Sequence, residues 1–204
     1  MSEDIITTVD LLRHGEPEGG NRYRGSLDDP LSEGGWAQLR AAVGQHRPWD
    51  VIVSSPLRRC AEFARELADK LDLALEIEPD LREITFGEWE GRTITEIMLS
   101  NPQALERFWH DPVNYTPPGG EPLLDCAARV TAAWHVVLER HAGRHVLIMG
   151  HGGMIRLVLQ HILEMPPGRI WRLEVPYASF SRVRVYGQGE AASPLLVFHG
   201  KGLA

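Results

Sequence analysis

Two kinds of hydrophobic pattern alternate along this chain. Short runs rich in isoleucine, valine and leucine predict β-strands at residues 5–12, 50–54, 73–77 and 145–149. Between them, apolar residues recur at the i, i+3, i+4, i+7 spacing of a helix, most clearly at 57–71 and again at 124–138. This alternation predicts an α/β fold, a three-layer sandwich whose mostly parallel central sheet is flanked by helices.

Residues that start or stop helices set the boundaries expected in the first half of the chain. Ser32 is placed to cap a helix that runs to about His46, and Pro48 stops it. The serines and the proline at 54–56 are expected to open the 57–71 helix, with the proline in its first turn.

The second half carries signals of the same kind. Gly143 is expected to end the second long helix. The segment 154–163 is apolar on most faces, which predicts a buried helix. The tail adds two expected strands, at 179–186 and 195–199, separated by a turn at 187–189. We expect these tail strands to be antiparallel edges of the sheet.

Between residues 79 and 122 the periodicity weakens, and prolines, glycines and aromatic residues gather. We predict short helices at 93–99 and 102–110, and a cap-like excursion over about 84–122 that covers the functional site. This segment is not expected to fold independently. The length of 204 residues suits one domain, so residues 1–204 are predicted to form a single domain.

Composition and charge narrow the range of functions. Apolar residues make up 43% of the chain, which is enough for a core, and the net charge is −7. This charge argues against a general nucleic-acid binder, because phosphate backbones attract basic surfaces. The negative net charge is still compatible with a small anionic substrate that binds in a local basic pocket. The two cysteines, Cys60 and Cys126, are expected to be reduced thiols.

Nothing in the pattern predicts membrane attachment or export. No apolar run is long enough to span a bilayer, and residues 1–4 include acidic side chains where a signal peptide needs basic ones. We therefore expect a soluble cytoplasmic protein. His141 and His145 have a His-x-x-x-His spacing but are assigned structural or surface roles, and no Cys-x-x-Cys spacing occurs, so no metal and no cofactor are predicted. The sequence is compatible with a homodimer but does not decide the oligomeric state.

Chemically useful side chains stand at two predicted strand ends. The first strand leads into Arg13 and His14, and the 145–149 strand leads into Gly-His-Gly-Gly, which contains His151. Open α/β folds place their ligand crevice at the carboxyl edge of the sheet, where these two ends are expected to meet. Arginine binds phosphate through a planar fork, and the N–H groups of a helix start after His151 add positive charge. A neutral, oriented histidine can attack phosphorus.

Other groups fit the same chemistry. Arg59, in the first turns of the 57–71 helix, would help to neutralise a transferring phosphoryl group. The leaving alcohol needs a proton, for which Glu83 and Glu88 are available. Taken singly, each of these motifs is more often a tight turn or a solvated surface residue than part of an active site. The remaining histidines are assigned structural or surface roles: His46, His110, His135, His141, His145, His161 and His199.

Four motifs occur together and in order. They are Leu-Leu-Arg-His-Gly-Glu at 11–16, Ser-Ser-Pro-Leu-Arg-Arg at 54–59, Leu-Arg-Glu with Phe-Gly-Glu-Trp-Glu-Gly at 81–91, and Gly-His-Gly-Gly at 150–153. As a set they resemble the histidine phosphatase superfamily, the phosphoglycerate mutase-like proteins, and the resemblance covers nearly the whole chain.

This resemblance implies a site and a reaction. His14 is the implied nucleophile that becomes phosphohistidine. The implied phosphate pocket consists of Arg13, Arg59, His151 and Gly152. Glu83 is the implied proton donor to the leaving group and later the base that activates water. His151 takes a catalytic role as well. The implied activity is that of a metal-independent phosphoric monoester hydrolase.

At some positions the chain departs from the family pattern. Phe63 stands where many members have threonine, which affects only packing. Asn21 corresponds to the asparagine that often follows Arg-His-Gly, although it lies one residue further along the chain than the family pattern has it. By this correspondence Asn21 is expected to contact the phosphate. Pro122 replaces a serine, which removes a hydroxyl near the cap.

The resemblance within the superfamily is greatest to α-ribazole-5′-phosphate phosphatases of cobalamin assembly. It rests on the loop 22–31 and on the cap sequence 108–121. The implied partner is thus a small phosphorylated metabolite, and Trp89, Trp109 and Tyr115 either stack on its leaving group or pack the cap. The short cap favours hydrolysis over mutase chemistry. The alternatives are a broad-specificity histidine phosphatase, a phosphoglycerate mutase-like enzyme and a non-catalytic phosphate-binding protein.

Overall fold

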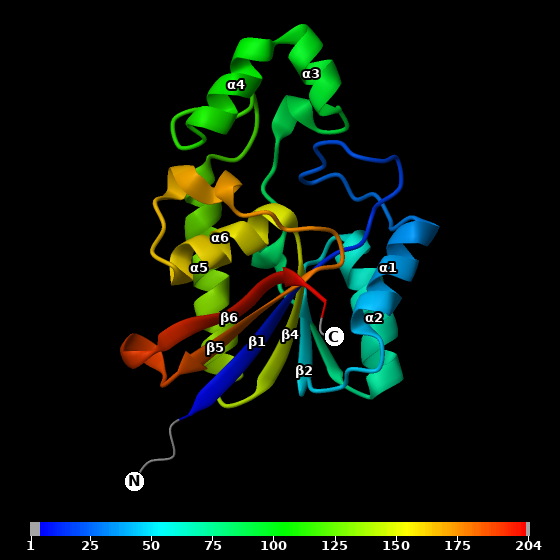
Figure 1. Ribbon diagram of the computed structural model, residues 1–204, viewed down its shortest axis with the longest axis vertical. Coiled ribbons are helices and arrows are strands. Elements are labelled where there is room, and N and C mark those ends of the chain that lie inside the picture. Colours follow the sequence, from blue (N-terminus) through cyan, green and yellow to red (C-terminus); the bar gives the residue numbers. More distant parts are fainter. Residues whose placement is uncertain (1–4, 203–204) are drawn as a thin grey trace.

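A six-stranded sheet lies at the centre of the molecule (Figure 1). The computed structural model of the chain describes residues 5–202, so the acidic segment 1–4 invoked in the export argument lies outside them. The strand order is β3-β2-β4-β1-β5-β6. The strands are β1 (Ile6–Arg13), β2 (Val51–Ser54), β3 (Ala74–Ile77), β4 (His145–Gly150), β5 (Phe180–Tyr186) and β6 (Ser193–Lys201).

Helices cover both faces of this sheet. In Figure 1, α1 (Glu33–Val43) and α2 (Arg58–Leu71) lie on one side of it, and α5 (Leu123–Arg140) and α6 (Gly152–Ile162) lie on the other. Strands β1 to β4 are all parallel to their neighbours among these four. The predicted three-layer α/β architecture is confirmed.

The buried strands divide their side chains between two hydrophobic clusters. On β2, Val51 and Val53 belong to the cluster that contains α5 and α6 residues, while Ile52 belongs to the cluster formed with α1 and α2. Successive side chains of a strand point to opposite faces. Because both faces are covered, the strand sequences are apolar at nearly every position rather than alternating.

The tail strands are antiparallel as expected, but only one of them is an edge. β5 pairs antiparallel with β1 from Ile6–Tyr186 to Leu12–Phe180 and pairs on its other side with β6. β5 is therefore an interior strand, and β6 forms the edge. Sequence alone did not distinguish them, because both are short and similarly apolar.

Two expected helix boundaries need correction. The Ser32 hydroxyl caps α1 by accepting from the Gly35 N–H, but α1 ends at Val43 instead of continuing to His46, because Gly44 takes a positive φ of 53°. α2 begins at Arg58, so the proline at 54–56 precedes the helix instead of lying in its first turn. The N-cap residue of α2, Leu57, makes no side-chain hydrogen bond to the start of the helix.

The excursion contains the two predicted short helices, α3 (Ile94–Ser100) and α4 (Pro102–His110). Figure 1 shows both at one end of the molecule, beyond the layers that flank the sheet. Their buried side chains, including Ile97 and Phe108, nevertheless belong to the same hydrophobic cluster as β1 and β4 residues.

The structure also contains short 3₁₀ helices that the sequence did not predict. They are η1 (Pro79–Leu81), η2 (Gly87–Trp89), η3 (Pro167–Arg172) and η4 (Gly189–Ala191). Within residues 5–202, no helix has both the length and the apolar character needed to cross a membrane.

Candidate active site

A cleft of about 250 Å³ opens at the carboxyl ends of β1 and β4, where Arg13 pairs with Gly150. Its lining includes the sequence-predicted residues Arg13, His14, Asn21, Arg59, Glu83 and Gly152. The four motifs that lie far apart in the sequence therefore meet at one place. His151 lies behind this lining and is completely buried.

His14 has the properties of a nucleophile held in its neutral form. Its Nδ1 lies 2.7 Å from the Gly15 carbonyl oxygen. A carbonyl can only accept, so Nδ1 carries the proton and Nε2 keeps a free lone pair. Burial, together with the nearby charges of Arg13 and Arg59, holds the pKa of His14 well below its usual range.

His151 uses both of its ring nitrogens inside the protein. The Arg59 Nε–H donates to Nδ1 at 3.2 Å, so Nε2 carries the proton and donates to the Ser55 hydroxyl at 2.6 Å. Its ring lies edge-on to that of His14, with centroids 5.3 Å apart. Burial and the charge of Arg59 hold the pKa of His151 well below its usual range. In this arrangement His151 orients Arg59 and supports the His14 ring.

The two pocket arginines are fixed by carbonyl oxygens. Arg59 is fully buried and donates to the carbonyl oxygens of Gly25 and Leu27, which ties the 13–30 loop to α2. Arg13 donates to the Val175 carbonyl, and its guanidinium lies 4.0 Å from the centre of the Tyr177 ring. Neither cation is paired with a carboxylate in the part of the chain that the structure describes.

The 13–30 loop also caps α2 from outside the helix. The Asp28 carboxylate accepts from the Arg58 N–H at 2.7 Å, which replaces the cap expected from the serines. Arg24, which the sequence analysis did not single out, pairs with Asp29 and lines the cleft. Asn21 is exposed and also lines the cleft.

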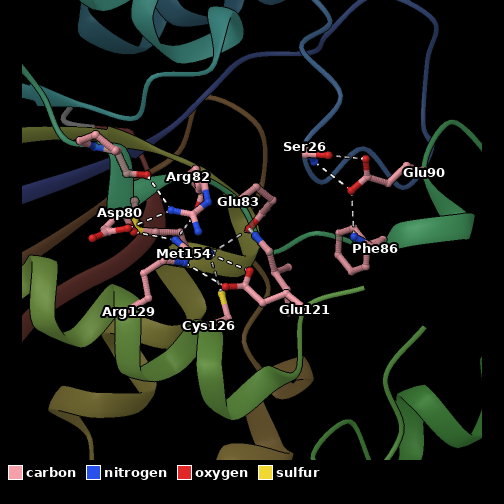
Figure 2. Close-up of polar contacts among 12 residues, drawn as sticks. Ser26, Asp80, Arg82, Glu83, Phe86, Glu90, Glu121, Cys126, Arg129 and Met154 are labelled. Atoms are coloured by element: carbon pink, nitrogen blue, oxygen red, sulfur yellow. Dashed lines mark hydrogen bonds and ion pairs between the residues drawn. The ribbon is translucent and has the colours of Figure 1, made fainter. Parts of the chain in front are cut away.

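Glu83 rests on the N-terminus of α6. Its carboxylate accepts from the Gly153 and Met154 N–H groups, each at 3.0 Å (Figure 2). A Cβ atom on Gly153 would lie only 2.4 Å from a Glu83 oxygen, which explains the last glycine of Gly-His-Gly-Gly. Glu88, the other acid that the sequence offered, lies in η2 and is not among the cleft's lining residues.

A partly buried ion pair between Arg129 and Glu121 fixes the backbone on both sides of Glu83. On α5, Arg129 forms two parallel hydrogen bonds with Glu121 and also donates to the carbonyl oxygens of Asp80 and Arg82 (Figure 2). The Glu121 N–H donates to the Thr85 carbonyl. The residues just before and just after Glu83 are therefore held by the same pair.

Replacing Arg129 by Met is expected to lower the free energy of unfolding by about 1–3 kcal/mol, because it leaves the partly buried Glu121 carboxylate without its partner. The two side chains are only 10% and 15% exposed, so water screens the pair weakly. Urea denaturation measures the loss. Arg140→Met, which breaks an exposed pair with Glu76, is the control and should change stability far less. Equal losses in the two variants would contradict a structural role for the pair of Arg129 and Glu121.

The two buried histidines are expected to make stability depend on pH. Below their ordinary value of 6.5, the unfolded chain binds protons on His14 and His151 whereas the native state does not, so the free energy of unfolding falls as pH falls. Each histidine should contribute about 1.4 kcal/mol of loss between pH 7.5 and 5.5. Urea denaturation at both pH values should show a smaller loss for His14→Asn and His151→Asn than for the wild type. The exposed His46→Asn variant should keep the wild-type slope.

Several residues of the cleft were missed by sequence reasoning. Ser55 was singled out only as the start of a motif, yet its hydroxyl holds His151. Arg156 had a signal, since it is the only Lys, Arg, Asp or Glu in the helix and residues 154–159 around it are otherwise apolar. Trp171 and Tyr177 had none, because the approach of their segment to His14 depends on tertiary structure. Among residues 5–202, no three His, Cys, Asp or Glu side chains are grouped to hold a metal ion.

The sequence pattern of the Histidine phosphatase superfamily (branch 1) matches residues 9–195. The chain belongs to this superfamily. A bifunctional protein of Mycobacterium tuberculosis is 34% identical over 195 residues, which cover 93% of this chain and 53% of that protein. The chain thus spans about half the length of the first curated relatives that it matches.

Solved structures agree with this membership. A mycobacterial glucosyl-3-phosphoglycerate phosphatase superposes with a TM-score of 0.84 at 30% identity, over 96% of this chain and 99% of that one. An Escherichia coli protein named as an α-ribazole-5′-phosphate phosphatase superposes with a TM-score of 0.82, over 97% and 99% of the two chains. Its identity is 23%, so this likeness concerns the fold alone.

Proposed function

We propose that this chain is a phosphomonoester hydrolase that acts through a phosphohistidine on His14. The observation that carries the proposal is a neutral His14 with a free Nε2 in a cleft that also contains Arg13, Arg59 and the N-terminus of α6. Two fixed guanidinium groups supply the positive charge that magnesium supplies in other phosphoryl-transfer sites, and the N-terminus of α6 holds Glu83 beside them.

The first step forms the bond from His14 Nε2 to phosphorus and breaks the bond from phosphorus to the ester oxygen. The imidazole becomes positively charged, and its Nδ1–H bond to the Gly15 carbonyl stabilises that charge. The leaving oxygen takes a proton from Glu83, which must exchange a bond to α6 for this contact. In the second step Glu83 accepts a proton from water, the water oxygen bonds to phosphorus, and the electrons of the P–N bond return to His14.

The outer wall of the cleft suits a small organic leaving group. Tyr23, Trp109 and Trp171 line it and offer ring surfaces to a base such as that of α-ribazole 5′-phosphate, the substrate that the sequence favours. The 30% identical structure is named for glucosyl-3-phosphoglycerate, which favours a phosphorylated hydroxy acid instead. We therefore propose a small phosphorylated metabolite as substrate, with these two chemistries to be compared directly.

The proposal is tested by phosphate release in EDTA from α-ribazole 5′-phosphate, 3-phosphoglycerate, common nucleotides and p-nitrophenyl phosphate. Release from any of them supports hydrolysis, and the highest kcat/KM identifies the substrate class. Conversion of 3-phosphoglycerate to its isomer without phosphate release would instead favour a mutase. Neither release nor isomerisation across the panel would contradict the proposal.

A further inference from the structure

Arg156 is a charged residue on the buried helix α6, and the residues next to it on this helix are apolar. The residues around it on α6, from Met154 to Leu159, are otherwise buried and hydrophobic. A helical side chain leans toward the N-terminus of its helix, so Arg156 lies over the turn that begins at Gly152. Its side chain lines the cleft that contains His14.

The position of the guanidinium can be defined at three points. A Cβ atom on Gly152 would lie 3.1 Å from Arg156 Nη1 and 3.4 Å from Arg13 Nε, so the two cations flank the start of α6. The Arg156 Nε–H donates to the Leu173 carbonyl at 2.8 Å. The guanidinium carbon lies 5.6 Å from the centre of the Trp171 ring. Arg156 therefore stands between the phosphate end of the cleft and its aromatic outer wall.

Charge balance argues that this arginine has a partner in the substrate. Within residues 5–202, Arg156 lies within salt-bridge distance of no carboxylate, and the same holds for Arg13 and Arg59. Glu83, the acid in the cleft lining, is bonded to the α6 N–H groups. A phosphomonoester brings about two negative charges at neutral pH. When Glu83 carries the proton that it gives to the leaving oxygen, the three partly desolvated cations exceed the charge of the phosphomonoester, and a buried charge without a partner is costly.

We propose that Arg156 binds a second anionic group of the substrate, a carboxylate a few bonds away from the phosphorus atom. One guanidinium neutralises the single charge of a carboxylate and matches its geometry through the two terminal nitrogens. Arg156 would then select phosphorylated hydroxy acids over phosphorylated alcohols. This inference rests on the proposed phosphatase function, because it assigns the substrate class of the same cleft.

Two substrate pairs differ only at the proposed group. They are 3-phosphoglycerate with glycerol 3-phosphate, and O-phosphoserine with O-phosphoethanolamine. The wild type is expected to favour the carboxylate-bearing member of each pair. In Arg156→Met, the ratio of kcat/KM within a pair should fall by about 10- to 150-fold, the range expected for a lost hydrogen bond to a charged group. Arg156→Lys should recover part of the ratio, because it keeps the charge but not the fork.

Arg172→Met removes the same charge at an exposed neighbouring position and should leave the ratio unchanged. The inference is overturned if the wild type shows no preference within either pair. It is equally overturned if Arg156→Met lowers both members of a pair by the same factor, since Arg156 would then act on the transferred phosphoryl group. A different result would show that the proposed phosphatase function itself is wrong. In that case His14→Ala would hydrolyse all four substrates as fast as the wild type.

Discussion

Replacing His14 by Ala is expected to lower kcat for phosphate release by on the order of 10⁴- to 10⁶-fold, the scale on which other enzymes lose rate when their nucleophile is removed. The reason is that the Nε2 lone pair, which the Nδ1–H bond to Gly15 leaves free, forms the covalent intermediate. Stopped-flow phosphate detection measures the rate, and acid-labile, base-stable label from ³²P-substrate measures the phosphoenzyme. Both signals should vanish together in the variant.

A surface histidine provides the matched control for this experiment. His110, at the end of α4, is exposed and is not among the cleft's lining residues, so His110→Ala should keep both the rate and the labelled intermediate. Label trapped on the His14→Ala chain would disprove the nucleophile assignment, whatever the rate.

Replacing Glu83 by Gln is expected to lower kcat by on the order of 10²- to 10⁴-fold for a substrate with an alkyl leaving group, because that oxygen needs a proton as it departs. The cost of the first step should shrink for p-nitrophenyl phosphate, whose leaving group is stable as an anion. Burst kinetics separate the two steps. With p-nitrophenyl phosphate the variant should release nitrophenol rapidly and then accumulate phosphoenzyme, since Gln cannot accept the proton from water.

Glu88→Gln is the control, since Glu88 lies outside the cleft lining and should leave both steps unchanged. If Glu83→Gln slows nitrophenol release as much as it slows release of an alkyl alcohol, the proton-donor role is wrong. Glu83 would then act only by holding the start of α6.

The layers of the fold could be predicted because each buried element has a strong local pattern. The helix at Arg58–Leu71 and the strand at His145–Gly150 follow from periodicity and from runs of apolar residues. The position of β5 inside the sheet could not be predicted, because strand order depends on pairing between residues far apart in sequence. The end of α1 was missed because Gly44 ends the helix with a positive φ before the later proline is reached.

The site was predictable to the extent that its residues stand in local motifs. His14 and Glu83 were found because they occupy recognisable strings, and the structure places both in the cleft. The exact contacts of His151 were not found, because nothing in Gly-His-Gly-Gly shows that Arg59 and Ser55 occupy both ring nitrogens. Arg156 was passed over because an isolated charge in an apolar helix was interpreted with its neighbours as core.

The sheet order has a consequence for biosynthesis. β1 leaves the ribosome well before its two partners in the sheet, β4 and β5, which lie far later in the chain. At about 5–20 residues per second, translation of residues 14–144 takes on the order of ten seconds. During that time the apolar first strand has neither of its neighbours, and His14 has no site around it. We expect the nascent chain to bind chaperones through this strand until the second half of the protein has been made.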